Sequence, residues 1–242
     1  MKDKNKIYQK GWQKNWFNQC YSSRKKPHKL DHFYDLSRVI LMYKHSPPQG
    51  LILDVGAGEC KISSVLSRVL GKKVKIVALD FSSTGLSKCK HRGFRGCLIM
   101  GDCHNLPFRT DVFDTISCLE VIEHVGSPKL LIRSIRRALK ENGTLILTTP
   151  NGNRIIRIMG RLLYRDIKID YSHIHEFSIK EIAGILHKEK LKIVNSIGLS
   201  FDVPYPILVR MPDSIIRILL TLMKRKTPLV FFKFLGVISK KI

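Results

Sequence analysis

The chain has 242 residues, 44% of them hydrophobic, which is enough for one sizeable core with additional segments. Forty-three Lys and Arg residues against 19 Asp and Glu residues give a formal net charge of +24, and much of the excess lies in residues 1–30 and 205–242. No run reaches the roughly 18 consecutive apolar residues of a membrane-spanning helix, and the N-terminus is too polar for a secretory signal.

The basic ends and the cysteines bear on where the protein works. Cationic flanks favour nucleic acid, anionic lipid or an acidic partner, although a general lysine excess that aids solubility is the alternative. The cysteines form no C-x-x-C pair and several lie in apolar runs, so we expect small buried thiols in a reducing compartment. We therefore expect a cytoplasmic protein, with a peripheral position at the inner membrane face as a further hypothesis. The six cysteines are Cys20, Cys60, Cys89, Cys97, Cys103 and Cys118.

Along the chain, residues 1–45 are basic and aromatic, and we expect a helical cap over a ligand crevice. Residues 46–203 then alternate short apolar runs with longer amphipathic ones. This alternation indicates βαβ units and therefore an α/β domain, with a mostly parallel sheet covered by helices on both faces. The predicted strands are 51–55, 74–79, 97–100, 113–119, 143–149 and 191–199, and the predicted helices are 59–70, 82–91, 127–141 and 178–188.

Two segments depart from this pattern. Residues 151–170 interleave apolar residues with four arginines after a strand end, which predicts a lid-like insertion. Residues 204–242 form a basic amphipathic C-terminal segment, with a cationic helical pattern at 214–226 and a very apolar stretch at 229–238. Such a sequence resembles an interfacial membrane anchor. Packing on the sheet, or a homodimer interface, is the alternative interpretation.

The end of the first predicted strand carries the clearest ligand signal. In 51–58, Leu-Ile-Leu-Asp-Val-Gly-Ala-Gly, two glycines allow a tight turn whose backbone lies close to a ligand. Asp80 ends the second strand, placed to accept hydrogen bonds from ribose hydroxyls, and Asp102 follows the third, where it could accept one from an adenine amino group. A dinucleotide fingerprint would need a third glycine where Lys61 stands, and no P-loop is present.

Residues 51–150 resemble the class I S-adenosylmethionine-dependent methyltransferases through Leu-Asp-Val-Gly-Ala-Gly, Ala-Leu-Asp, Gly-Asp-x-x-x-Leu-Pro-Phe, Phe-Asp-x-Ile and Glu-x-x-Glu-His. The resemblance extends to about residue 200 and covers neither basic end. It implies a Rossmann-like seven-stranded sheet and S-adenosylmethionine as cofactor, with the glycines at its methionine part, Asp54 near the amino acid end, Asp80 at the ribose and Asp102 at the adenine. The full set of expected cofactor-binding residues is Asp54, Gly56, Ala57, Gly58, Asp80, Phe81, Asp102, Cys103 and Glu120.

Acids and histidines are expected at the rim of the same crevice. The fourth strand runs into Glu120-Val-Ile-Glu123-His124, and helical spacing would put both carboxylates and the imidazole on one face. His173 and His175 precede a later helix. Two carboxylates so close repel unless a cation or a proton lies between them, and oxygen with imidazole suits Mg²⁺, Mn²⁺ or Fe²⁺.

Two methyltransferase families bear on this cluster. The O-methyltransferases of ubiquinone biosynthesis resemble the chain in Glu-x-x-Glu-His-Val, and small-RNA 2′-O-methyltransferases use Glu-x-x-Glu-His with a downstream histidine to hold a metal. The second resemblance implies Glu120, Glu123, His124 and His173 as metal ligands. His124 or His173 as a general base is the alternative, and a helix-capping role is a third interpretation.

The sequence therefore favours a methyltransferase acting on a hydroxyl of an amphiphilic small molecule, lipid or glycan precursor, reached at an anionic membrane surface. An RNA 2′-O-methyltransferase with a divalent metal is the first alternative, favoured by the net charge, although no nucleic-acid-binding motif accompanies it. A non-catalytic cofactor-binding or scaffold protein is the second.

Overall fold

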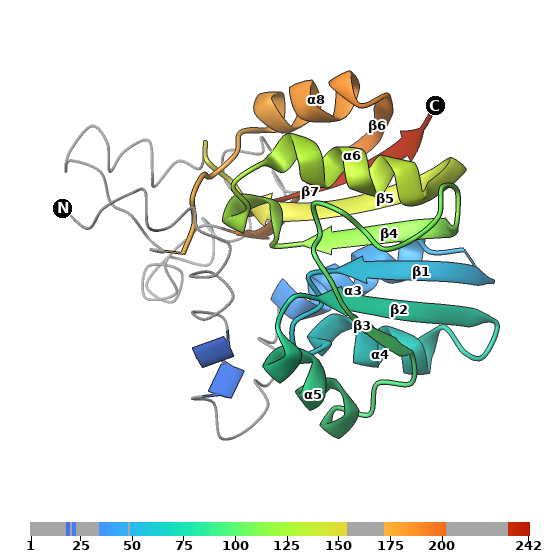
Figure 1. The fold of residues 1–242 in the computed structure, drawn as a ribbon. Helices are drawn as coiled ribbons and strands as arrows, with labels where there is room; N and C mark the ends of the chain where they lie inside the picture. The colour runs from blue at the N-terminus through green and yellow to red at the C-terminus, as the bar shows by residue number, and fades with distance from the viewer. Residues whose placement is uncertain (1–17, 20, 23–33, 48, 154–171, 202–231) are drawn as a thin grey trace, which may run out of the picture.

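The computed structural model describes residues 18–19, 21–22, 34–47, 49–153, 172–201 and 232–242 (Figure 1). Its centre is one seven-stranded sheet. The strands are β1 (Gly50–Val55), β2 (Val74–Asp80), β3 (Cys97–Met100), β4 (Phe113–Leu119), β5 (Leu139–Pro150), β6 (Leu191–Phe201) and β7 (Phe232–Lys241).

The strand order is β3-β2-β1-β4-β5-β7-β6. The first five strands are parallel, and β7 runs antiparallel to both of its neighbours. The chain moves outward from β1 to β3 and then returns to the other side of β1, so the strand order reverses between β1 and β4. Ligands of open α/β sheets bind at the carboxyl ends of the strands beside such a reversal. The predicted Rossmann-like seven-stranded α/β fold is confirmed.

Helices cover both faces of the sheet, as Figure 1 shows. Successive residues of a strand point to opposite faces of the sheet. In β1, Leu53 belongs to the apolar cluster that includes α6 and α8, and Ile52 belongs to the cluster that includes α3 and α4. Both faces of β1 are therefore buried. The described helices are α3 (Tyr34–His45), α4 (Lys61–Val69), α5 (Ser83–His91), the 3₁₀ turn η1 (Ile122–His124), α6 (Pro128–Ala138) and α8 (Ile179–Lys188).

The predicted helix over 127–141 ends earlier than expected. Helix α6 stops at Ala138, and Leu139 already pairs with Phe113 of β4 as the first residue of β5. A left-handed backbone at Asn142, with φ of 61°, interrupts the pattern before the regular part of the strand. The apolar spacing of the helix continued through Leu139, so it did not mark this change.

The C-terminal residues differ from the expectation for 204–242. Residues 232–241 form β7 in the interior of the sheet, and Leu235, Val237 and Ile238 are buried there. The methyltransferase-like domain therefore reaches residue 241 rather than 203, and most of the stretch expected at a membrane surface packs within the sheet. The amphipathic pattern at 214–226 lies outside the described residues.

The N-terminal region also contributes to the core. Helix α3 buries Val39, Leu41 and Met42 against the sheet, so residues 34–45 cover a sheet face rather than the crevice. Of the predicted lid at 151–170, only 151–153 are described. Among the described residues, no helix is both long and apolar enough to cross a bilayer.

Candidate active site

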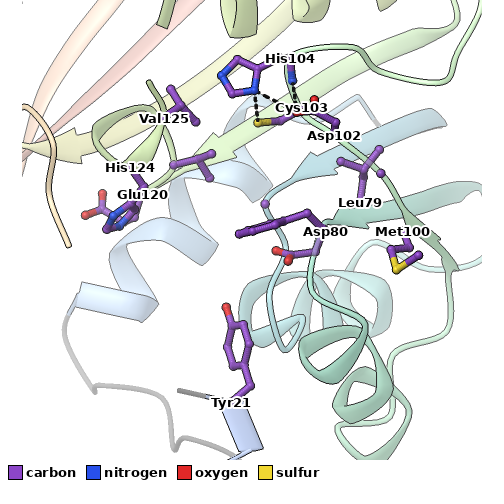
Figure 2. A pocket seen from close by; sticks show the side chains of 14 residues that line it. Tyr21, Leu79, Asp80, Met100, Asp102, Cys103, His104, Glu120, His124 and Val125 are labelled. Atoms are coloured by element: carbon purple, nitrogen blue, oxygen red, sulfur yellow. Dashed lines mark hydrogen bonds and ion pairs between the residues drawn. The ribbon is translucent and has the colours of Figure 1, made fainter. Parts of the chain in front are cut away.

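A cavity of about 360 Å³ lies at the carboxyl ends of the parallel strands (Figure 2). Each of four neighbouring strands sends a residue into its lining: Gly56 follows β1, Asp80 ends β2, Asp102 follows β3 and Glu120 follows β4. The volume falls within the usual range of small-molecule sites. The carboxyl ends that the sequence predicted to converge do form one site.

The turn after β1 requires glycine for two reasons. Gly56 and Gly58 have φ values of 71° and 53°, in the left-handed region that other residues rarely adopt. A Cβ on Gly56 would lie 2.3 Å from Cγ2 of Val121, and one on Gly58 would lie 2.4 Å from the hydroxyl oxygen of Tyr21. The N–H group of Gly56 donates to the carbonyl of Leu79 at 2.8 Å, which folds the turn over the end of β2.

Asp80 holds this turn while it lines the cavity. Its Oδ2 accepts a hydrogen bond from the Gly58 N–H at 2.8 Å, and its Oδ1 accepts one from the Ser82 N–H at 2.8 Å. Burial raises the pKa of the Asp80 carboxyl, and these two hydrogen bonds act in the opposite direction. Each carboxylate oxygen has a second lone pair, so Asp80 can position the turn and still accept from a ligand hydroxyl.

Asp54 is placed differently from the expectation. It is 5% exposed, and the hydroxyls of Ser63 and Ser117 donate to it, so it ties β1 to α4 and β4. Burial raises its pKa as well. Among the expected cofactor-binding residues, Gly56, Asp80, Phe81, Asp102, Cys103 and Glu120 line the described cavity, whereas Asp54, Ala57 and Gly58 lie outside its lining.

The far end of the cavity is formed by the turn after β3. Nδ1 of His104 lies 2.9 Å from Oδ1 of Asp102, which also accepts the His104 backbone N–H at 3.0 Å. Arg137 of α6 holds the following Leu-Pro-Phe segment by donating to the carbonyl oxygens of Leu106 and Phe108 at 2.6 and 2.7 Å. Hydrogen bonds within the turn, together with those from Arg137 of α6, therefore hold this segment in place.

Sequence reasoning missed several lining residues. The missed set is Tyr21, Leu79, Met100, Gly101, His104, Val121 and Val125. Most of them are immediate neighbours of a predicted residue, so the motifs themselves could have indicated them. Tyr21 is distant in sequence from these motifs, and its only sequence signal was the aromatic N-terminal segment expected to cap the crevice.

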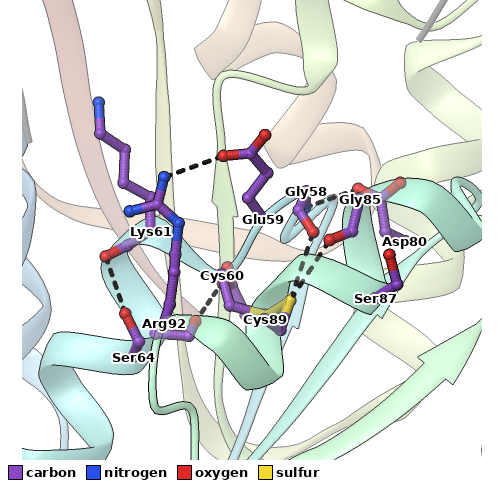
Figure 3. The surroundings of a disulfide bond; sticks show 12 residues. Gly58, Glu59, Cys60, Lys61, Ser64, Asp80, Gly85, Ser87, Cys89 and Arg92 are labelled. Carbon is purple, nitrogen blue, oxygen red and sulfur yellow. Dashed lines mark hydrogen bonds and ion pairs between the residues drawn. A yellow bond between two sulfur atoms is a disulfide. The ribbon is translucent and has the colours of Figure 1, made fainter. Parts of the chain in front are cut away.

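A disulfide joins Cys60 to Cys89 behind the glycine turn (Figure 3). Both residues are fully buried, with their Cα atoms 5.1 Å apart. Cys60 is the N-cap residue of α4, and Cys89 lies in α5. Glu59 links the same elements through ion pairs with Arg92 at 2.9 Å and Lys88 at 3.6 Å.

The prediction of free thiols is therefore wrong for Cys60 and Cys89. The βαβ connections place α5 beside the start of α4, and a separation of 29 residues in sequence does not reveal that proximity. Within the described part of the chain, Cys97, Cys103 and Cys118 form no disulfide, whereas Cys20 lies outside it.

Glu120 lines the other end of the cavity after β4, and Glu123 lies buried behind the lining. Glu120 has a left-handed backbone with φ of 56°, an uncommon conformation for a residue with a side chain. Glu123 is fully buried, and Thr149 donates to its Oε2 at 3.1 Å. Burial, followed by the nearby carboxylate of Glu120, raises the pKa of Glu123 well above its ordinary value. The two carboxyls form one electrostatically linked pair.

His124 lines the cavity next to this pair, and His173 packs against it with ring centroids 4.9 Å apart. Nδ1 of His124 lies 3.0 Å from the carbonyl oxygen of Ser172. Because a carbonyl oxygen can only accept, Nδ1 is the donor in this contact, and in the neutral imidazole the lone pair then lies on Nε2. Nδ1 of His173 lies 3.5 Å from Oε1 of Glu176.

Residues 172–177 reach the site through backbone hydrogen bonds. The N–H of Ile174 donates to the carbonyl of Glu123 at 2.8 Å, and Gly152 donates to that of Phe177 at 2.9 Å. One possible metal-ligating atom from each of Glu123, His124 and His173 lies within 4.8 Å of the other two. Glu120 does not belong to this group. His175 is exposed and pairs with Glu181 instead.

Comparison with known proteins indicates which family this domain resembles. Residues 53–147 match the family described as "Methyltransferase domain". Demethylmenaquinone methyltransferase of Thermotoga maritima is 33% identical over 106 residues, covering 43% of this chain and 46% of that protein. Ubiquinone biosynthesis O-methyltransferase of Idiomarina loihiensis is 28% identical over 107 residues, covering 42% and 43% respectively.

A crystal structure from Thermotoga maritima, titled as an S-adenosylmethionine-dependent methyltransferase and possible histamine N-methyltransferase, superimposes with a TM-score of 0.68. It is 17% identical, and the match covers 95% of this chain and 100% of that one, so it bears on the fold alone. The chain spans about half the length of the curated relatives it matches. With the matching domain, the shared fold and the strand-end residues in one cavity, residues 53–147 are identified as a methyltransferase domain similar to those of the class I S-adenosylmethionine-dependent enzymes.

Proposed function

We propose that the protein transfers a methyl group from S-adenosylmethionine to a hydroxyl oxygen of a small amphiphilic acceptor. One observation carries this proposal: a single cavity runs from the acids at the ends of β2 and β3 to His124 after β4. It therefore joins groups suited to a nucleoside with a group suited to accepting a proton.

The residues present fit the cofactor. Gly56 lines the cavity without a side chain, and Val121 and Tyr21 pack closely against the glycine turn. Asp80 and Asp102 offer carboxylate oxygens to hydroxyl and amino donors, and apolar Leu79 and Met100 lie between them in the lining. Asp80 would accept from the ribose and Asp102 from the adenine.

The cofactor supplies an electrophilic methyl group on a sulfonium, and the chain supplies position and a proton acceptor. Nε2 of His124 would accept the proton that the acceptor hydroxyl loses on methylation. The Ser172 carbonyl keeps the imidazole in the required tautomer. His173 packs on the His124 ring and acts as a positioning residue.

Two features favour an apolar acceptor with a hydroxyl. Val121 and Val125 line the cavity on either side of His124 in sequence. The similar curated proteins named above include two quinone-pathway methyltransferases, one of them an O-methyltransferase. A position at an anionic membrane surface stays a prediction. Part of the C-terminal segment that suggested it forms β7, and the rest of that segment lies outside the described residues.

The test is transfer of labelled methyl from S-adenosylmethionine into the lipid, small-molecule, RNA and protein fractions of a cell extract. We expect label in the lipid or small-molecule fraction, and we expect His124→Ala to reduce it by about 100-fold or more, the usual contribution of a general base. His175→Ala is the matched control because that histidine is exposed and pairs with Glu181. Absence of label from every fraction would leave a cofactor-binding or scaffold protein.

A metal-dependent RNA 2′-O-methyltransferase is the second candidate, favoured by the clustered donors of Glu123, His124 and His173. Each histidine has a hydrogen-bonding partner at Nδ1, which is how proteins orient imidazole ligands. Under this alternative Glu123, His124 and His173 would hold the metal, and His124 would not act as the base. Label would enter RNA, would require added Mn²⁺ or Mg²⁺ after chelation, and would fall steeply between low and physiological salt.

A further inference from the structure

A second cavity, of about 470 Å³, lies at the opposite edge of the sheet from the candidate active site. Its lining includes Leu51, Val74 and Cys97, which stand at the starts of β1, β2 and β3, the strands that Figure 1 shows side by side. Because these strands are parallel, their amino ends meet at this edge. The two cavities share no lining residue.

The rim of this second cavity carries positive charge. Among the described residues that line it, none is acidic, and the four cations have exposed side chains. Within the described part of the chain, none of these four forms an ion pair. Asp114 contacts Leu51 from β4, but it accepts the Leu51 N–H at 2.9 Å and pairs with Lys140 at 2.8 Å. The four cations are Arg68, Lys72, Lys75 and Arg95.

The fold brings these cations together from separate connections. Arg68 lies in the last turn of α4, and Lys72 follows in the turn before β2. A Cβ on Gly96 would lie 2.1 Å from the carbonyl oxygen of Ile76, so the loop before β3 packs directly on β2. This close approach brings Arg95 to the same cavity.

The buried part of the lining is apolar. Val74, Ile76 and Val77 are 7%, 4% and 9% exposed. A cationic rim over an apolar floor suits a ligand that carries anionic groups on a carbon skeleton. A phosphate monoester has a charge of about −1.5 to −2 at pH 7, so roughly two phosphate groups match four cations. The planar guanidinium of arginine also binds phosphate through two parallel hydrogen bonds.

We propose that this second cavity binds a small organic ligand with two phosphate groups, held by the four cations of its rim. The inference does not depend on the proposed methyl transfer, since it uses no residue of the candidate active site. The ligand is an additional one and not the methyl acceptor, because the cavity lies at the other ends of the strands.

The test is calorimetric titration with inorganic pyrophosphate and with uridine diphosphate at physiological ionic strength. We expect wild type to bind both, and uridine diphosphate more tightly because its nucleoside covers the apolar floor. Lys72→Gln with Lys75→Gln should weaken both about tenfold, less than two full hydrogen bonds to charged groups would give, because both lysines are exposed. Lys180→Gln with Lys188→Gln is the matched control, since these exposed lysines lie on α8 beside β6, at the far end of the sheet.

Cys97 provides a second measurement within the cavity, because its exposed thiol forms no disulfide. Uridine diphosphate should slow the alkylation of Cys97 by iodoacetamide in wild type and in the α8 control, but not in the Lys72 and Lys75 variant. Peptide mass mapping separates Cys97 from Cys103, which lines the other cavity and should be unaffected.

The proposal fails if wild type binds neither probe. Equal weakening by the two double variants would mean that the probes respond to net charge alone, and the site would be abandoned. Equal affinity for pyrophosphate and uridine diphosphate would contradict the role of the apolar floor. If a short single-stranded RNA binds while neither probe does, and the Lys72 and Lys75 variant loses that binding, the surface belongs to nucleic acid instead. Circular dichroism melts of both variants ensure that folded proteins are compared.

Discussion

The disulfide between Cys60 and Cys89 closes a loop with a sequence separation of 29 residues. A cross-link of this span removes about 12 cal/mol/K of chain entropy from the unfolded state, equivalent to about 3.6 kcal/mol at 25 °C. Glu59 still pairs with Arg92 when the disulfide is absent, so part of the local geometry survives. We therefore expect Cys60→Ser to lower the free energy of unfolding by about 2–4 kcal/mol.

The measurement is guanidinium unfolding under oxidising conditions. Cys97→Ser is the matched control, since Cys97 is an exposed free thiol. Wild type treated with dithiothreitol should unfold at the same denaturant concentration as Cys60→Ser, and dithiothreitol should not change Cys60→Ser further. If wild type, Cys60→Ser and Cys97→Ser unfold together without reductant, the cross-link does not form in solution and the reasoning is wrong.

Three further predictions concern the turn, the carboxylate beneath it and the last strand. Gly56→Ala should lower the free energy of unfolding by about 2 kcal/mol more than Gly71→Ala does. Both glycines have φ near 70°, but only Gly56 faces a neighbouring side chain, that of Val121. Urea unfolding measures the difference, and equal losses would exclude the clash. The raised pKa of Asp80 means that its own contribution to stability is largest at low pH and is lost as pH rises through that pKa, whereas cofactor binding needs the carboxylate. Calorimetry should therefore show that affinity falls with decreasing pH already above the usual titration range of aspartate, with no such fall in Asp80→Asn. Lys241→Met should lower the unfolding free energy by about 1–3 kcal/mol, because the 2% exposed ammonium donates to the Leu139 carbonyl at 2.9 Å; an unchanged value would argue against β7 in the sheet.

The core of the fold was predictable from sequence because its strands are buried on both faces. Such strands are rich in consecutive apolar residues, as in 51–53, and the glycines after β1 end that strand. The convergence of Asp80 and Asp102 followed from the same pattern, since parallel strands bring their carboxyl ends to one edge. These features depend on residues close in sequence.

The features that escaped prediction depend on residues that are distant in sequence. Residues 232–241 insert between β5 and β6, yet their apolar and cationic composition equally suits a surface segment. The pairing of Cys60 with Cys89 and the approach of Tyr21 to Gly58 arise from how α5 and the N-terminal segment pack. Asp54 sits in a motif whose pattern identifies a ligand turn, but its carboxylate is satisfied by two serines that the pattern does not reveal.

The central claim is that the cavity at the ends of β1 to β4 binds S-adenosylmethionine, and calorimetric titration with S-adenosylhomocysteine tests it most directly. We expect one saturable site in wild type, at least tenfold weaker binding by folded Asp80→Ala, as roughly one lost hydrogen bond to a charged group implies, and unchanged binding by Glu141→Ala, whose side chain is 62% exposed. Wild-type affinity in Asp80→Ala, or no binding by the wild-type protein, would contradict the account.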